Sequence, residues 1–177
     1  MTDLEWRLTR GTQHDVIRLH QLFCTPAVYR YLADGYPPPR SATEAWIQRG
    51  IDDQQRGDLG LWLLQNKPTG LAGCVRTHLL DAPETAELTY VLHPDWWGRG
   101  LATSMGWTAT CHAFAGGRIV QMIAGTDEPN TASAAVMRRL GMRYLRATQN
   151  PRWPGVEYVR QRDDPPPDPL PSLLPIS

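Results

Sequence analysis

The sequence predicts one α+β domain with a mixed, mostly antiparallel sheet flanked by helices. Its 177 residues are enough for a single domain with a substantial core. Local apolar patterns predict a strand, three helices, three strands in succession, and then a helix, a strand, a helix and two strands. Such runs of helices and of strands, without strict alternation, are typical of the α+β class.

Composition argues against several kinds of protein. Eighteen basic and eighteen acidic residues give no net charge, which argues against a partner that is a nucleic acid or a membrane surface. No apolar run approaches the roughly 20 residues of a membrane helix, and the acidic, mixed N-terminus is not typical of a signal peptide. Scattered cysteines at 24, 74 and 111 predict reduced thiols in a cytoplasmic protein and no metal site.

The first half of the chain is assigned from caps, prolines and apolar spacing. The expected elements are a strand over 5–10, helices over 13–23, 26–33 and 41–56, and a β-hairpin with strands over 59–65 and 71–78. Thr12 with Asp15 has the pattern of a helix N-terminus. Ser41 and Glu44 have the spacing of a capping box, after a loop at 34–40 that contains three prolines.

In the second half, the expected strands cover 85–92, 119–124, 142–147 and 156–162, and the expected helices cover 100–115 and 131–140. Residues 163–177 contain six prolines. We therefore expect a domain of residues 1–162 followed by an extended or disordered tail. Removing this tail is expected to leave thermal stability nearly unchanged.

One segment carries recognisable chemistry. The expected strand at 85–92 leads through a loop into a helix that starts within Gly98-Arg-Gly-Leu-Ala102. Glycines leave backbone N–H groups uncovered, and the helix start adds a positive dipole end, so the segment suits a phosphate or pyrophosphate. Arg99 adds positive charge. Thr103 stands where a Rossmann fingerprint has its third glycine, and no P-loop lysine follows.

The segment Trp97-Gly-Arg-Gly-Leu-Ala102 resembles the acyl-CoA pyrophosphate loop of the GNAT superfamily of N-acetyltransferases. Trp97, together with Asn130-Thr-Ala-Ser133 and Leu140-Gly-Met142, is similar to the Rim-type branch, which includes ribosomal-protein-alanine N-acetyltransferases. The resemblance covers residues 5–162. It implies a GNAT-like fold and acetyl-CoA as cosubstrate, with a primary amine as the acetyl acceptor, on a protein N-terminus or a small molecule. The protein would be a monomer or a homodimer.

The resemblance also implies roles for individual residues. Ser133 is the candidate proton donor to the leaving thiolate, since Met137 stands where many members have a tyrosine. Glu87 is the candidate base. The amine pocket is expected between two loops, at 29–40 and 150–154, with Tyr36 and Trp153 as candidate walls. Contacts with the cosubstrate are expected from Tyr90, Leu92, Gly98, Arg99, Gly100, Leu101, Ala102, Thr103 and Asn130.

These assignments have open alternatives. Ser133 could be a helix-start residue and Glu87 a solvated charge on a strand. A lysine-like amine, with a pKa near ~10.4, needs a base before it can attack, whereas an α-amine needs less help. Two other functions compete with catalysis: an acyl-CoA-binding or sensor domain without turnover, and an interaction module that uses the proline-rich tail.

Overall fold

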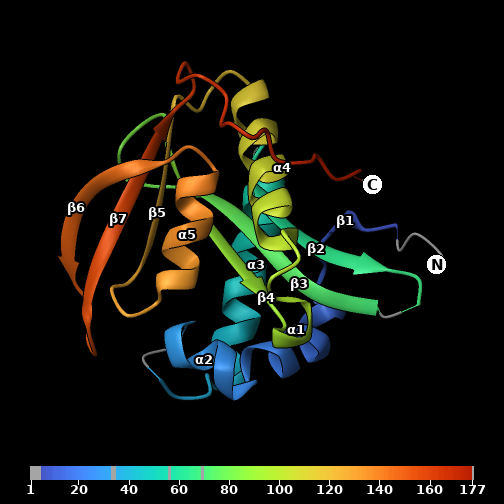
Figure 1. The fold of residues 1–177 in the computed structure, drawn as a ribbon. Coiled ribbons are helices and arrows are strands. Elements are labelled where there is room, and N and C mark those ends of the chain that lie inside the picture. Colours follow the sequence, from blue (N-terminus) through green and yellow to red (C-terminus); the bar gives the residue numbers. More distant parts are fainter. Residues whose placement is uncertain (1–4, 33–34, 56, 69, 177) are drawn as a thin grey trace.

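The computed structural model describes residues 5–32, 35–55, 57–68 and 70–176, and it shows the predicted α+β fold (Figure 1). The strands are β1 (Arg7–Arg10), β2 (Gly60–Asn66), β3 (Gly70–Leu79), β4 (Thr85–Leu92), β5 (Gln121–Asp127), β6 (Arg143–Gln149) and β7 (Pro154–Gln161). The helices are α1 (Val16–Phe23), α2 (Pro26–Leu32), α3 (Arg40–Gln55), α4 (Leu101–Ala115) and α5 (Thr131–Arg139), with short 3-10 turns η1 (Gln13–Asp15) and η2 (Pro94–Trp96).

The strands form one sheet in the order β1-β2-β3-β4-β5-β7-β6. Every neighbouring pair is antiparallel except β4 and β5, which run parallel. Helices α4 and α5 lie on one face of the sheet, while α1 and α3 lie on the other (Figure 1). The predicted order of elements is therefore confirmed. In the described part of the chain, no helix combines the length and apolar character needed to cross a membrane.

Most element boundaries shift by one to three residues from the prediction, and two of these shifts have a clear physical cause. Ser41 does not cap α3, because the helix already begins at Arg40, and the N–H of Ala42 donates to the carbonyl of Pro39 at 2.9 Å. The Glu44 carboxylate instead accepts from Arg40, four residues earlier. Strand β5 continues through Asp127, beyond the expected end at Ala124, because β7 pairs with it along its whole length. The expected end of the second helix at 33, the first residue of the expected loop at 34 and the expected end of the third helix at 56 lie outside the described residues.

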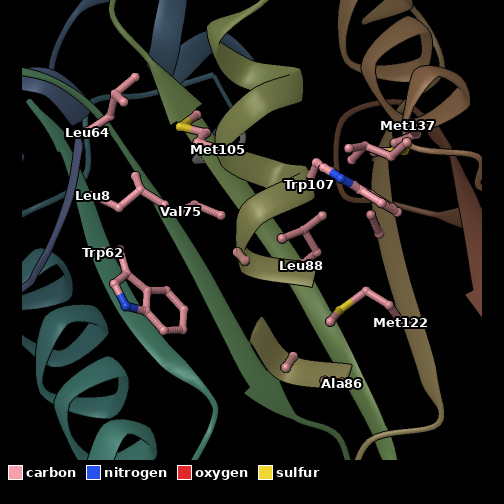
Figure 2. Close-up of a cluster of buried hydrophobic side chains, with 14 of the residues drawn as sticks. Leu8, Trp62, Leu64, Val75, Ala86, Leu88, Met105, Trp107, Met122 and Met137 are labelled. Atoms are coloured by element: carbon pink, nitrogen blue, oxygen red, sulfur yellow. The ribbon is translucent and has the colours of Figure 1, made fainter. Parts of the chain in front are cut away.

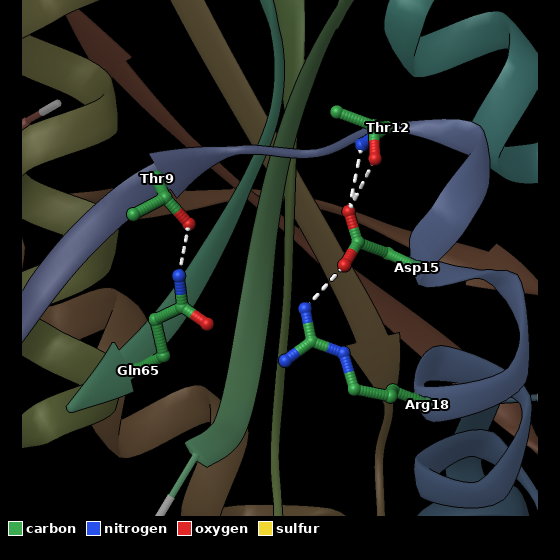
Figure 3. Close-up of polar contacts among 5 residues, drawn as sticks. All are labelled: Thr9, Thr12, Asp15, Arg18 and Gln65. Atoms are coloured by element: carbon green, nitrogen blue, oxygen red, sulfur yellow. Dashed lines mark hydrogen bonds and ion pairs between the residues drawn. The ribbon is translucent and has the colours of Figure 1, made fainter. Parts of the chain in front are cut away.

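Polar side-chain contacts hold the segment 9–18 in place (Figure 3). The backbone N–H and the hydroxyl of Thr12 both donate to one oxygen of Asp15 at 2.9 Å, and Arg18 donates to the other. Burial raises the pKa of Asp15, but the hydrogen bonds from Arg18 and Thr12 outweigh it and hold that pKa below its usual value. Gln65 of β2 donates to Thr9 at 2.7 Å, so β1 and the entry to α1 are tied to the sheet.

Alternating side chains of the central strands divide between two cores. The core beneath α4 contains Trp62, Val75 and Leu88 from the strands and Met105 from the helix (Figure 2). The core beneath α1 and α3 is built around Ile47 and the side chains of the same strands that point to the other face of the sheet. Each fully buried large aliphatic side chain contributes about 1.5–3 kcal/mol, so both faces of the sheet are held firmly.

Strands β4 and β5 are paired only at their beginnings. The recorded pairs are Thr85↔Gln121, Ala86↔Met122 and Glu87↔Ile123. Beyond Glu87, β4 remains paired with β3 and β5 with β7, so the two parallel strands diverge. One backbone edge of β4 therefore lacks a strand partner between 88 and 92. That edge retains unused hydrogen-bonding groups.

The tail beyond residue 162 is extended and packs on the domain. The N–H of Leu8 donates to the carbonyl of Pro175 at 2.8 Å, and Leu8 and Ile176 form a parallel bridge at the edge of the sheet. The N–H of Leu174 donates to the hydroxyl of Thr108 in α4 at 2.9 Å. Arg160, only 3% exposed, donates to the carbonyls of Asp164 and Pro165. These contacts lead us to predict the opposite of the sequence-based expectation, namely that the tail contributes to stability.

Deletion of residues 163–177 is therefore predicted to lower the melting temperature. The lost hydrogen bonds and packing should cost about 2 kcal/mol, which corresponds to about 4–8 °C for a domain of this size. Thr108→Val and Thr110→Val form a matched pair for calorimetry, because each removes a hydroxyl bond to the carbonyl four residues earlier and Thr108 alone also contacts the tail. Equal melting temperatures for the full and truncated chains would contradict the packing.

Candidate active site

A cavity of about 810 Å³ opens where β4 and β5 diverge. Its walls come from the second half of β4, the loop into α4 with the first turn of that helix, one face of α5, the end of β5, and α2. Ligand pockets for small molecules are typically of this size. The divergence of the strands therefore coincides with a cavity of a size that suits a small-molecule ligand.

The loop before α4 presents a row of backbone amides to this cavity. Gly98 and Gly100 have φ of 73° and 76°, in the left-handed region that glycine alone adopts readily. A Cβ placed on either glycine would meet nothing within 4 Å, so the space beside them is open. From Gly98 onward in the described chain, the first backbone N–H that donates to a backbone carbonyl is that of Ser104, and its acceptor is the carbonyl of Gly100. Uncovered amides at a helix start, together with the helix dipole, are the arrangement typical of anion sites, so an anion site here stays a prediction.

Tryptophans hold this loop in place. The indole N–H of Trp97 donates to the carbonyl of Leu92 at 2.7 Å, which ties the loop to the end of β4. Trp96 packs edge-on against Trp6, with ring centroids 4.8 Å apart. The guanidinium of Arg99 lies 4.7 Å from the Trp96 ring centroid and is not part of the cavity lining. Of the expected cosubstrate contacts, Arg99 is thus the one that the structure places outside the cavity.

Tyr90 and Ser133 meet inside the cavity. The Tyr90 hydroxyl donates to the Ser133 carbonyl at 2.9 Å, and the two hydroxyl oxygens are also 2.9 Å apart. Burial raises the pKa of Tyr90 far above its usual value, and the hydrogen bond with Ser133 offsets this only in part. Asn130 caps α5 by accepting from the Ser133 N–H at 3.3 Å, which leaves its own N–H₂ donors for a ligand. Met137, by contrast, is buried in the core and has no access to the cavity.

Glu87 lies at the last recorded β4–β5 pair, on the face opposite Tyr90. Its carboxylate is 3.1 Å from Nε2 of His78 on β3, and its side chain is 36% exposed. The residue does not line the cavity. The structure therefore separates the candidate base from the candidate donor by the thickness of the sheet.

The two loops expected to form the amine pocket come together, although their named residues stay outside the cavity. The Trp153 ring lies 5.6 Å from that of Tyr31, and Tyr31 lines the cavity. Tyr36 is 75% exposed and does not. Tyr31 and Leu32 form this wall because α2 turns one side toward β4. The range 29–40 that the sequence predicts for one side of the pocket includes Tyr31 and Leu32, but the residue named from it was the exposed Tyr36.

Arg139 at the end of α5 also lines the cavity and was not predicted. Its spacing from Ser133 and Val136, three residues each time, was the available signal, because such residues share one face of a helix. Among the described residues, no group of three or more histidine, cysteine or acidic side chains is arranged to hold a metal ion.

Comparisons with known proteins give one consistent result. A family model described as an acetyltransferase (GNAT) domain matches residues 6–143. The RimL ribosomal L7/L12 alpha-N-protein acetyltransferase, solved with coenzyme A, is similar with a TM-score of 0.72 and 22% identity, over 89% of this chain and 94% of that one. A Salmonella typhimurium acetyltransferase that modifies the N-terminal serine of L7/L12 has a TM-score of 0.69 and 24% identity, over 91% and 96%.

A third similar structure is the microcin C7 self-immunity acetyltransferase MccE, solved with acetyl-CoA and AMP. Its TM-score is 0.73 with 18% identity, over 89% of this chain and 92% of that one. At these identities the structures establish the shared fold, while the family match rests on the sequence model.

Gly100→Asp tests whether the amide row is the anion site. The helix dipole would stabilise the new carboxylate, which would then occupy the space meant for a pyrophosphate. We expect the acetyl-CoA dissociation constant measured by calorimetry to rise at least about tenfold, or about 1.4 kcal/mol.

The matched control is Gly117→Asp, at the other end of α4. Gly117 has a φ of 77° and equally open space, so both variants carry the same backbone strain. The control should bind like the unmodified protein. Equal affinity in the two variants would place the anion site elsewhere.

Proposed function

The chain belongs to the acetyltransferase (GNAT) family and is an acetyl-CoA-dependent acetyltransferase, and we propose that it acetylates a primary amine, on a protein N-terminus or a small molecule, by direct attack in a ternary complex. One observation carries the proposal. A single cavity joins the uncovered amides before α4, the unpaired edge of β4 and the Tyr90–Ser133 pair.

This arrangement matches the parts of the cosubstrate in order. The amides from Gly98 to Thr103 suit its pyrophosphate. The edge of β4 that faces away from β3 offers backbone N–H and C=O groups to the amides of the pantetheine arm. Asn130 adds side-chain N–H donors from the start of α5. When bound there, acetyl-CoA supplies the activated acetyl thioester.

Ser133 is the proposed proton donor to the leaving sulfur, and Tyr90 is the residue that positions it. Because the Tyr90 hydrogen is directed to the Ser133 carbonyl, the phenol oxygen can accept from the Ser133 hydroxyl. The raised pKa of Tyr90 keeps the phenol protonated and makes it a poor acid. The proton that Ser133 gives up is replaced from water.

Glu87 is the proposed base that takes the proton of the attacking amine. Glu87 lies where the β4–β5 pairing stops, and its carboxylate contacts His78. The amine proton would therefore leave on the sheet face opposite the cavity and reach Glu87 through water. An α-amine, with a pKa near ~8, makes the smaller demand on such a base. The lining of the cavity contains no carboxylate among the described residues, which favours an acceptor with a single amine over a polyamine.

The three cysteines are free thiols. Reduced thiols are typical of the cytoplasm. This supports the further proposal that the protein works there.

Turnover with a panel of amines tests the proposed function. The panel contains peptides with free N-termini, N-terminally blocked peptides with one lysine, and small primary amines. We expect release of free coenzyme A that depends on the amine, with an acetylated product detected by mass spectrometry. If acetyl-CoA binds in calorimetry but no amine accelerates thiol release, the chain is a sensor domain.

Two variants then assign the donor within that assay. Ser133→Ala should lower kcat about ten- to a thousandfold with little change in the acetyl-CoA dissociation constant, because the proton is needed only as the carbon–sulfur bond breaks. Tyr90→Phe removes only the positioning contact, so we expect a smaller loss of kcat. A larger loss in Tyr90→Phe than in Ser133→Ala would make Tyr90 the donor and contradict the assignment.

A further inference from the structure

Two arginines and two aromatic rings form a row where α2 meets the turn at 150–153 between β6 and β7. The rings of Tyr31 and Trp153 are neighbours, with centroids 5.6 Å apart. The guanidinium of Arg30 lies 5.3 Å from the centroid of the Tyr31 ring, and that of Arg152 lies 4.1 Å from the centroid of the Trp153 ring. Both arginines are exposed. Two positive charges therefore flank one aromatic pair, and we call these four residues the cation–aromatic row.

The row lies beside the cavity, on the side of α2 (Figure 1). Tyr31 lines the cavity from α2. Across from it, Thr126 of β5 lines the cavity and is paired with Val156, three residues after Trp153. Val91 belongs to the core beneath α1 and α3 and also lines the cavity, so the cavity extends through the divergence towards α2. An amine that approaches from the side of the sheet opposite α4 therefore passes the row.

The guanidinium of Arg152 is held in place and keeps its hydrogen-bond donors. A Cβ placed on Gly35 would collide with this guanidinium, so the group packs directly on the backbone of the loop after α2. Stacking on Trp153 uses the flat face of the guanidinium and leaves the N–H groups in its plane available. Within the described part of the chain, Arg152 makes no hydrogen bond or ion pair. It is therefore a positioned cation with donors to offer a ligand.

The acidic side chains of the adjoining strands do not neutralise the row. Asp127 at the end of β5 accepts from Asn150 at 2.7 Å, and Glu157 of β7 accepts from Arg146 at 2.7 Å. Glu128 is exposed, and among the described residues it makes no ion pair with either arginine of the row. The side of the cavity at α2 therefore has a positively charged rim, which attracts an anionic acceptor and repels a cationic one.

We propose that the cation–aromatic row selects acceptors that carry a carboxylate close to the reacting amine, and that Arg152 binds this carboxylate. The proposal rests on the function proposed above, because it names the class of acceptor for the same reaction. A planar guanidinium can donate two parallel N–H bonds to a carboxylate, which gives both affinity and orientation.

The distance along the chain indicates where the carboxylate lies on the acceptor. Arg152 is four residues before Val156, which is level with the cavity wall at Thr126. An extended peptide advances about 3.4 Å per residue, so a peptide whose N-terminus lies in the cavity would bring its second to fourth residues to Arg152. The acceptor that fits is therefore an acidic peptide with a free N-terminus.

Acetylation of matched peptides tests the proposal. Each is a C-terminally amidated hexapeptide that begins with alanine and has three aspartates, three asparagines or three lysines at its second to fourth positions. We expect the unmodified chain to use the aspartate peptide with a kcat/KM about tenfold above that of the asparagine peptide, mainly through KM, and the lysine peptide least well. Added salt should reduce these differences, because the row is exposed.

Three variants assign the preference to one side chain. Arg152→Gln should bring the kcat/KM ratio of the aspartate and asparagine peptides to about one by raising KM for the aspartate peptide, and Arg152→Lys should restore part of the ratio. Arg143→Gln is the matched control, because it removes the same charge from an exposed position at the far end of β6, and it should preserve the ratio. Melting temperatures show whether each variant is folded.

Four outcomes would overturn the proposal. Equal kcat/KM for the aspartate and asparagine peptides would mean that the carboxylate is not recognised. An equal loss for both peptides in Arg152→Gln would make the guanidinium a clamp between the two loops. Use of free alanine in preference to alanine amide, without a preference among the peptides, would assign the carboxylate to a free amino acid. If acetyl-CoA binds but no amine or peptide is acetylated, the proposed function fails and this inference fails with it.

Discussion

The parallel pairing of β4 with β5 stops at Glu87 and Ile123, and the candidate site depends on this single feature of the sheet. Each strand keeps a full antiparallel partner on its other side, β3 for β4 and β7 for β5, so the separation costs only the hydrogen bonds between the two strands themselves. The result is an unpaired backbone edge along one wall of the cavity. A ligand with amide groups in an extended arm would satisfy that edge.

The chemistry of the cavity changes from one end to the other. At the mouth, backbone amides and a helix dipole attract anions without a buried side-chain charge. Towards the divergence, the walls become apolar apart from hydroxyl and amide groups, with Tyr90 and Ser133 locked together by hydrogen bonds. Apolar surroundings strengthen hydrogen bonds to a developing charge, which is what departure of a thiolate from an acyl group requires.

Local patterns predicted the elements well, because caps, alternation and prolines act over a few residues. The bounds of β4 agree with the alternation from Thr85 to Leu92, and Asn130 is the cap of α5. Contacts between distant residues could not be predicted in this way. The pairing of Tyr90 with Ser133 spans 43 positions, and the prolines of the tail indicate an extended chain without indicating that Leu174 reaches Thr108. Arg139 lines the cavity while its neighbour Arg138 donates to Tyr158, and this difference depends on helix phase within one residue.

Hydrogen exchange of the backbone amides, followed with and without acetyl-CoA, tests the central claim most directly. The amides from Gly98 to Thr103 lack backbone acceptors in the structure, so they should exchange rapidly in the unliganded protein. Addition of acetyl-CoA should slow exchange there and along residues 88–92, with little change in the helices on the opposite face. Protection confined to α1 and α3, or no protection at the loop despite measurable binding, would contradict the account.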